Sequence, residues 1–298
     1  MRVLLCLLLS CAVLAQQPVI PLYSGEVPCV DAVAADASHY DAEIGEVVTA
    51  VRVPDLIYFS PVPRSASQEA VLVIPGGGYT IEAYDLEGTD IARYLSARGY
   101  HAFVLRHRLP QGIEGPCKDH VAQDDAQQGL LSVRRLADSL GYRADRVGVM
   151  GFSAGGHLAG SVSVHARMED SLTTRPDFSI LVYPVLIMSA ADSGHAGSQA
   201  ALLGQAPDPQ RIRYYNLPTQ VDSLTPPTIL FHASDDTGVL PQNSLRYYEA
   251  LIAHGVPADL RIYARGGHGF GSARELAAPV SGWLEEAVTW IRSRYPTP

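Results

Sequence analysis

Short apolar runs alternate with amphipathic stretches along most of the chain. Residues 70–74 are apolar without interruption, which is typical of a strand buried on both faces of a sheet. Residues 121–140 repeat apolar side chains at helical spacing, and Gly141 is expected to end that helix. The same patterns predict strands at residues 47–53 and 56–59 (an opening pair), 70–74, 102–105, 147–150, 180–183, 228–231 and 260–263, and helices at 90–98, 121–140, 244–254 and 277–294.

Strands that alternate with helices predict an α/β fold with a mostly parallel sheet of about eight strands and helices on both faces. We expect one such domain over residues 46–298, preceded by an extended lead-in at residues 16–45. Residues 186–227 break the alternation and are interpreted as an insertion. Because ligands of such sheets bind beyond the carboxyl ends of the strands, the insertion is expected to help form a substrate pocket, although an ordinary surface excursion is the alternative.

The first fifteen residues have the pattern of a secretory signal peptide. Arg2 supplies the positive start, residues 3–9 form the apolar segment, and Ala15 precedes the expected cleavage point. A lipoprotein signal ending at Cys11 is a weaker alternative. The sequence therefore predicts a secreted or periplasmic protein, and no stretch approaches the roughly 20 apolar residues that a membrane span needs.

The cysteines, the net charge and the histidines bear on possible disulfides, partners and cofactors. The expected mature chain keeps Cys29 and Cys117, which either form a disulfide, as is common in oxidising compartments, or remain separate thiols. The formal charge of −9 argues against a nucleic-acid partner, because an acidic surface repels phosphates. The histidines are scattered without metal-ligand spacing, so neither a metal nor another cofactor is expected.

A G-x-S-x-G motif at residues 151–155 carries the clearest chemical signal. It follows the strand predicted at residues 147–150 and precedes a helix-like segment, which is the setting of the nucleophile elbow in α/β-hydrolases. Gly151 and Gly155 leave room for the tight turn. That turn would expose the hydroxyl of Ser153 and aim the backbone N–H of Ala154 at a reacting carbonyl. Ser153 is therefore the predicted nucleophile.

A second glycine cluster, at residues 76–78, directly follows the strand predicted at 70–74. In an α/β-hydrolase this position holds the second donor of the oxyanion hole, in an HGGG-type motif. Here Pro75 stands in place of the histidine, but backbone donors do not need an imidazole. The predicted oxyanion hole consists of the Ala154 amide and that of Gly77 or Gly78.

A serine nucleophile needs an imidazole base and a carboxylate that orients it, in the chain order Ser, acid, His. His268 lies between glycines in a loop after the strand predicted at 260–263, and it is the candidate base. Asp235 and Asp236 both lie in the loop after the strand predicted at 228–231. Either carboxylate satisfies the chain order.

Taken together, these motifs resemble the secreted α/β-hydrolases known as acetylxylan or carbohydrate esterases. The resemblance extends from Pro75 to Phe270 and includes the sequences PGGGY, GFSAGGHLA, DDTGVLPQNS and GGHGFG, as well as Glu87-Gly88. In that family the acid lies three residues before a valine, so Val239 implies Asp236 as the acid. Leu240 separates Val239 from Pro241 and departs from the family's D-D-x-x-V-P pattern.

The resemblance implies a serine esterase that removes acetyl groups from carbohydrate such as xylan, with a small-molecule or oligosaccharide ester as substrate. The motifs themselves indicate only acyl transfer through a serine ester. A generic short-chain carboxylesterase is the main alternative. A peptidase of the prolyl-oligopeptidase type is less favoured, because only about fifty residues precede the hydrolase strands where those enzymes carry a propeller. A non-catalytic sugar-binding protein would not need the intact serine, acid and histidine set.

Overall fold

A computed structural model describes residues 17–30, 34–62, 66–189, 192–274, 276 and 279–295. The predicted signal peptide, its cleavage point and Cys11 lie outside these residues. Within the described part of the chain, no helix has both the length and the apolar character needed to cross a membrane.

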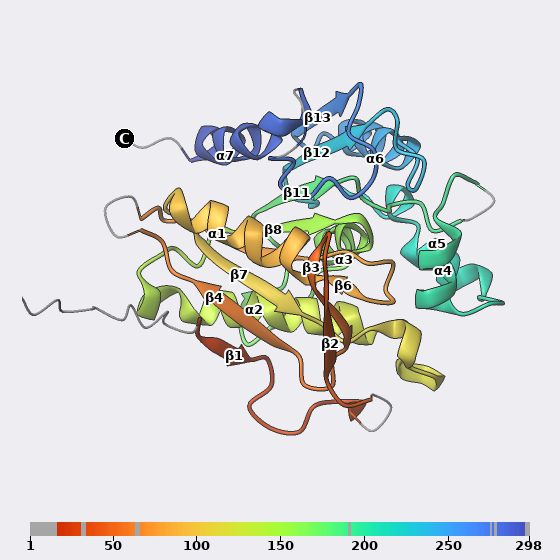
Figure 1. Ribbon diagram of the computed structural model, residues 1–298, viewed down its shortest axis with the longest axis horizontal. Coiled ribbons are helices and arrows are strands. Elements are labelled where there is room, and N and C mark those ends of the chain that lie inside the picture. The colour runs from red at the N-terminus through yellow and green to blue at the C-terminus, as the bar shows by residue number, and fades with distance from the viewer. Residues whose placement is uncertain are drawn as a thin grey trace, which may run out of the picture.

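An eight-stranded sheet forms the centre of the molecule, in the order β1-β4-β7-β5-β8-β11-β12-β13 (Figure 1). Its strands are β1 (Val19–Pro21), β4 (Asp55–Phe59), β5 (Ala70–Ile74), β7 (His101–Arg106), β8 (Val147–Phe152), β11 (Phe178–Val182), β12 (Thr228–Ala233) and β13 (Ala258–Tyr263). The pairs β1–β4 and β4–β7 are antiparallel, and the other neighbours run parallel. The predicted mostly parallel sheet of about eight strands is confirmed.

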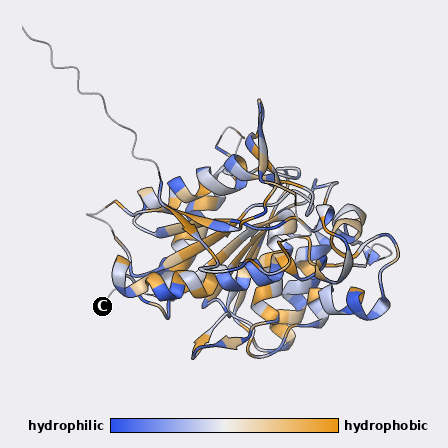
Figure 2. Ribbon diagram, turned by 90° about the horizontal axis from the view of Figure 1, so that it is seen from below, coloured by the Kyte–Doolittle hydropathy of each residue, from blue (hydrophilic) through white to orange (hydrophobic). Residues whose placement is uncertain are grey.

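Two separate cores cover the faces of this sheet, because successive side chains of a strand point to opposite faces. In β5, Leu72 belongs to the core under α2, α3 and α6, whereas Val71 and Val73 belong to the core under α1 and α7. Figure 2 shows the apolar strands enclosed between the helices. The longer helices are α1 (Asp90–Ala97), α2 (Val121–Leu140), α3 (Ser153–Val164), α4 (Ala196–Leu203), α5 (Pro209–Tyr215), α6 (Gln242–Ala253) and α7 (Trp283–Arg294).

The predicted opening strand pair is wrong in its pairing, although both strands exist. β3 (Gly45–Ala50) joins β2 (Ala37–Asp41) and β6 (Glu82–Ala83) in a separate three-stranded sheet. Both edges of β4 are already occupied by β1 and β7, so β3 cannot pair with it. A two-stranded ribbon of β9 (Met168–Glu169) and β10 (Leu172–Thr173) completes the strands.

The segment that the sequence suggested to be an extended lead-in is attached to the domain by strand pairing, a disulfide and hydrogen bonds. It supplies β1, and a disulfide joins Cys29 to Cys117, 88 residues later in the chain. Arg108 also forms a buried ion pair with Asp125, 2.6 Å between Nη2 and Oδ1, and donates a hydrogen bond to the carbonyl of Pro28. The disulfide was one of two alternatives left open by the sequence.

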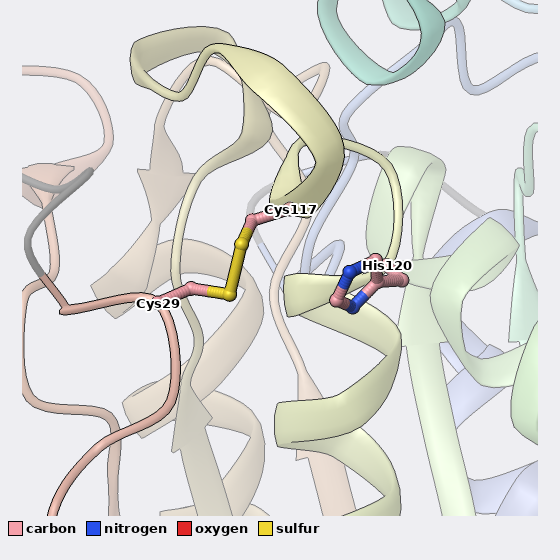
Figure 3. Close-up of side chains that lie close together, drawn as sticks. All are labelled: Cys29, Cys117 and His120. Atoms are coloured by element: carbon pink, nitrogen blue, oxygen red, sulfur yellow. A yellow bond between two sulfur atoms is a disulfide. The ribbon is translucent and has the colours of Figure 1, made fainter.

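His120 lies close to this disulfide, as Figure 3 shows. Among the described residues, Cys29, Cys117 and His120 are the one group of three side chains close enough together to hold a metal. Both sulfur atoms are joined to each other, however, so neither is available as a thiolate ligand. This cluster is therefore a crosslink rather than a metal site.

Candidate active site

The candidate site lies at the carboxyl ends of neighbouring strands. Ser153 follows β8, the glycine loop at 76–78 follows β5, and Tyr183 follows β11. Asp236 and His268 lie in the loops after β12 and β13. Since parallel strands end at the same edge of a sheet, this topology brings together residues that are far apart in sequence.

Ser153 has a backbone conformation that serine rarely adopts, with φ of +49°. It is the first residue of α3, so the amide of Ala154 lies in the helix's first turn, where amides lack a helical partner. The neighbouring glycines are required by space. A Cβ on Gly151 would lie 2.3 Å from the carbonyl oxygen of Gly155, and one on Gly155 would lie 2.3 Å from that of Pro75. The strand, turn and helix therefore form the tight turn that the motif predicts.

The three predicted triad residues lie in one hydrogen-bonded row. Ser153 Oγ is 2.8 Å from His268 Nε2, and His268 Nδ1 is 2.8 Å from Asp236 Oδ2. A carboxylate can only accept, so Nδ1 carries the proton and Nε2 is left to accept from the serine hydroxyl. The His268 side chain is 29% exposed, so solvent and substrate can reach the base. This arrangement can transfer a proton from Ser153 to His268.

Asp236 is buried and is surrounded by donors. Its Oδ1 accepts hydrogen bonds from the amides of Gly238 and Val239, and its Oδ2 also lies 3.2 Å from His232 Nε2. Burial alone would raise the pKa of Asp236. The hydrogen bonds from His232, His268 and Val239 outweigh burial and hold that pKa well below its usual range. Asp236 therefore remains ionised beside His268.

Asp235, the other acid candidate, has a different position. It is exposed, and its Oδ1 accepts from the amides of Gly266 and Gly267 at 2.9 and 2.8 Å. It therefore supports the backbone of the histidine loop, and among the described residues it makes no hydrogen bond with the imidazole. The geometry favours Asp236 as the acid.

The glycine loop presents backbone amides beside the serine. Gly76 packs so closely that a Cβ there would lie 2.9 Å from the Ser153 Cβ. Gly77 and Gly78 have positive φ of 138° and 67°, which glycine adopts without strain. Within the described residues, no acceptor takes a hydrogen bond from the amide of either glycine. The amides of Gly77 and Gly78 therefore remain available, as the sequence analysis expected of the oxyanion hole.

Three polar residues that the sequence analysis left without a role also contact this site. Glu87 accepts a hydrogen bond from the Gly76 amide, and Tyr183 packs edge-on against His268 with ring centroids 5.0 Å apart. His232 contacts Asp236 and is fully buried. Glu87-Gly88 formed part of the family resemblance, but nothing in the local sequence of Tyr183 or His232 indicated these contacts.

The insertion lies near enough to the site to interact with it electrostatically. His195, the N-cap of α4, interacts electrostatically with His268 and Asp236, although burial is the main reason that its pKa is lowered. His157 on α3 connects Tyr79, next to the glycine loop, with Tyr215 of the insertion. Its ring nitrogens lie 2.7 Å from the Tyr79 hydroxyl and 2.8 Å from the Tyr215 carbonyl. In Figure 1, α4 and α5 lie together at one end of the molecule. The insertion is thus tied to the residue that follows the glycine loop.

Comparison with known proteins places this site in a family. The sequence profile of the prolyl oligopeptidase family matches residues 114–290. An acetylxylan esterase of Xylanibacter ruminicola is 37% identical over 75% of this chain and 46% of its own length. Endo-1,4-beta-xylanase B of Butyrivibrio fibrisolvens is 31% identical over 72% of this chain and 34% of its own length. The chain therefore spans about half or less of the length of these curated relatives.

A solved structure agrees over nearly the whole chain. The acetyl ester-xyloside bifunctional hydrolase of Caldicellulosiruptor lactoaceticus is 33% identical, with a TM-score of 0.79 that covers 95% of this chain and 98% of that one. This similarity confirms the predicted α/β-hydrolase fold. With the matched profile extending over more than half of the sequence, the chain belongs to the prolyl oligopeptidase family of α/β-hydrolases.

Proposed function

We propose that this protein is a serine esterase that removes short acyl groups, chiefly acetyl, from carbohydrate such as xylan. The observation that carries the proposal is the row formed by Ser153, His268 and Asp236 on a strained turn, beside available backbone amides. The acetylxylan esterase and the acetyl ester-xyloside hydrolase among its relatives support the choice of acyl group and sugar.

In the proposed reaction, the Oγ of Ser153 attacks the ester carbonyl carbon while His268 Nε2 takes the hydroxyl proton. Asp236 stabilises the imidazolium that forms. The amides of Ala154 and of Gly77 or Gly78 donate to the carbonyl oxygen, which becomes negatively charged in the tetrahedral intermediate. When the intermediate collapses, His268 returns the proton to the sugar oxygen, and the sugar leaves while the acyl group stays on Ser153.

The second half of the reaction repeats these steps with water. His268 takes a proton from water, whose oxygen attacks the acyl carbon, and the same amides stabilise the second oxyanion. When this intermediate collapses, His268 returns its proton to Ser153 Oγ and restores the hydroxyl, and acetic acid leaves and ionises by giving its proton to solvent. Every proton moves between Ser153, His268, the leaving sugar and water. The reaction is therefore balanced by the ester and water alone.

We further propose that the insertion at residues 186–227 lines the substrate pocket and that residues 46–298 act as one catalytic domain. His195 lies near enough to His268 and Asp236 to interact with them electrostatically, which supports the pocket assignment. The predicted signal peptide and the Cys29–Cys117 disulfide support export to an oxidising compartment. Mass spectrometry of the exported protein would test this, since cleavage after Ala15 leaves Gln16 as the first residue.

The test of the activity compares the purified protein with a Ser153→Ala variant on an aryl acetate, acetylated xylan and a chromogenic peptide amide. We expect acetate release from both esters, with kcat lower by about 10⁵–10⁶ in the variant. The alanine variant should fold at least as stably as the wild type, and a thermal melt checks this.

Each other outcome has its own meaning. Turnover of the aryl acetate without acetate release from xylan would leave a generic carboxylesterase. Turnover of the amide alone would favour a peptidase of the family whose profile the chain matches. Ester hydrolysis that persists in Ser153→Ala, or no ester hydrolysis by the wild type, would contradict the proposal.

A further inference from the structure

Glu87 is a buried carboxylate that lies directly behind the glycine loop. It belongs to a π-helical turn (Asp85–Thr89) that leads into α1, and its side chain is 4% exposed. Its Oε2 accepts a hydrogen bond of 2.7 Å from the amide of Gly76. The Gly76 amide is therefore not an oxyanion donor. Its hydrogen bond to Glu87 fixes the backbone immediately before Gly77 and Gly78.

The adjacent Gly88 explains how Glu87 reaches the loop. A Cβ on Gly88 would lie 2.9 Å from Val104 Cγ1 and 3.1 Å from Pro75 Cγ. Glycine at this position lets the π-helical turn pack against the end of β5, which is where the glycine loop begins. Irregular turns of this kind are frequent at functional sites.

The other oxygen of Glu87 is connected to the histidine loop. Its Oε1 accepts from the Tyr183 hydroxyl at 2.8 Å, and that hydroxyl accepts from the amide of Gly271 at 3.1 Å. The Tyr183 ring also packs against His268, with 5.0 Å between centroids, and against Phe270, with 4.4 Å. One carboxylate thus links the loop that stabilises the oxyanion to the loop that carries the base.

From these contacts we propose that Glu87 is a positioning residue of the proposed esterase reaction. Its carboxylate holds Gly77–Gly78 and His268 in fixed positions relative to Ser153. The inference rests on the proposed function, because it concerns how accurately the same amides and imidazole are placed. Glu87 itself touches no reacting atom.

A carboxylate suits this position because both of its oxygens accept hydrogen bonds and neither donates one. A glutamine would keep one oxygen but turn an NH₂ group toward either the Gly76 amide or the Tyr183 hydroxyl. Facing the amide, the NH₂ group would set two donors against each other. Facing the hydroxyl, it could donate to the Tyr183 oxygen, but the Tyr183 O–H would lose its acceptor. Either way a buried donor is left without a partner, and the loop would shift. A displacement of about 1 Å near reacting groups can cost about 100-fold in rate.

Glu82 provides a matched control. It is also fully buried, and its Oε1 accepts from a backbone amide, that of His107, at 2.8 Å. Its Oε2 has no hydrogen-bond partner among the described residues. An amide group in place of this carboxylate therefore keeps the one hydrogen bond, and among the described residues Glu82 makes no hydrogen bond to the histidine loop.

The experiment measures kcat, KM and melting temperature on an aryl acetate for Glu87→Gln, Tyr183→Phe, the double variant and Glu82→Gln. We expect Glu87→Gln to lower kcat by about 10- to 100-fold while KM changes less than about threefold. Tyr183→Phe, which removes one hydroxyl, should lower kcat less and should add little further loss in the double variant. Glu82→Gln should keep kcat within about threefold.

The outcomes separate this inference from the function on which it rests. If the wild type shows no Ser153-dependent ester hydrolysis, the proposed function fails. If it is active but Glu87→Gln retains wild-type kcat, the positioning role is wrong. A general folding role is indicated instead if Glu82→Gln and Glu87→Gln lower kcat and melting temperature together. Should Glu87→Gln not fold, Tyr183→Phe with unchanged kcat would overturn the proposal.

Discussion

The carboxyl edge of the sheet and the attachment of the N-terminal segment are built in different ways. At the edge, Ser153 has a positive φ and a buried carboxylate, that of Asp236, is hydrogen-bonded to His268. The amides of Gly77 and Gly78 there have no acceptor among the described residues. At the attachment, a disulfide joins Cys29 to Cys117, and Arg108, which forms a buried ion pair with Asp125, donates a hydrogen bond to the carbonyl of Pro28.

This difference predicts whether a substitution should change the reaction rate or the stability of the fold. The edge keeps donors, strain and a partly exposed imidazole ready for a substrate, so changes there should reduce rate more than stability. At the attachment, Arg108 and Asp125 are paired with each other, and Arg108 also binds the Pro28 carbonyl. Changes there should therefore reduce stability and leave the rate nearly unchanged. The following predictions test this contrast, beginning with the largest expected effect.

Asp236→Asn should lower kcat by about 10⁴, as the same exchange does in a comparable triad. The amide cannot hold His268 with its proton on Nδ1, so Nε2 would no longer accept from Ser153. Kinetics on an aryl acetate measure the loss, and a thermal melt should show a folded protein. The result would contradict the assignment if kcat stayed within about tenfold of the wild type.

Asp235→Asn is the matched control. The asparagine oxygen can still accept from the amides of Gly266 and Gly267, so only a modest hydrogen-bond loss is expected, about tenfold or less in kcat. A larger loss in this variant than in Asp236→Asn would reverse the choice between the two acids.

The sequence was informative about this edge because each reacting group has a local marker. Ser153 has a glycine two residues away on each side, His268 lies directly between two glycines, and each of the three triad positions follows a predicted strand. The chain order then limits which loop can supply which group. Sequence alone left the two aspartates open, and only the spacing to Val239 in the resembling family favoured Asp236.

The supporting residues could not be predicted in this way. Glu87 and Tyr183 are 96 residues apart, and their contact depends on how the π-helical turn packs against the strand ends. The predicted pairing of β3 with β4 was wrong because it too depended on contacts between distant parts of the chain. β1 is a three-residue strand in a segment without periodicity, so nothing indicated that it would occupy the edge of β4.

Arg108→Met should lower the free energy of unfolding by about 3–5 kcal/mol, because it leaves the buried Asp125 carboxylate without its cation. Chemical denaturation measures the loss, and kcat should stay within about threefold where the variant is folded. The double variant Arg108→Met/Asp125→Leu should lose less, since no unpaired charge remains. Equal losses in both variants would show that packing, not charge, dominates at this site.

Cys29→Ser/Cys117→Ser should lower the free energy of unfolding by about 2–4 kcal/mol, because the crosslink restricts a long loop in the unfolded chain. Treatment of the wild type with a reductant should give a similar loss, and the double serine variant should not respond to the reductant. The contrast between the two regions would fail if removal of the disulfide reduced kcat by tenfold or more.

The last expected effect is confined to acidic pH and concerns His157, whose buried imidazole joins Tyr79 to the insertion. Burial lowers the pKa of His157 to about 4, below the value of about 6.5 expected in the unfolded chain. Between these values the unfolded chain binds the proton more readily. Stability from this group is therefore complete above pH 6.5, falls as the pH decreases toward 4, and is constant below that, with a total change of about 3 kcal/mol at most.

In His157→Gln, the difference in unfolding free energy between pH 7 and pH 4 should shrink by up to about 3 kcal/mol, measured by denaturation at several pH values. Part of the pH dependence should remain, because burial also lowers the pKa of His101 to about 4. His101→Gln, on β7, is the matched control and should remove its own share of the pH dependence without changing kcat. If His157→Gln retains the wild-type pH dependence, the imidazole is not buried in its neutral form. If it lowers kcat while His101→Gln does not, the bridge to Tyr79 belongs with the reactive edge of the sheet rather than with its stable attachment.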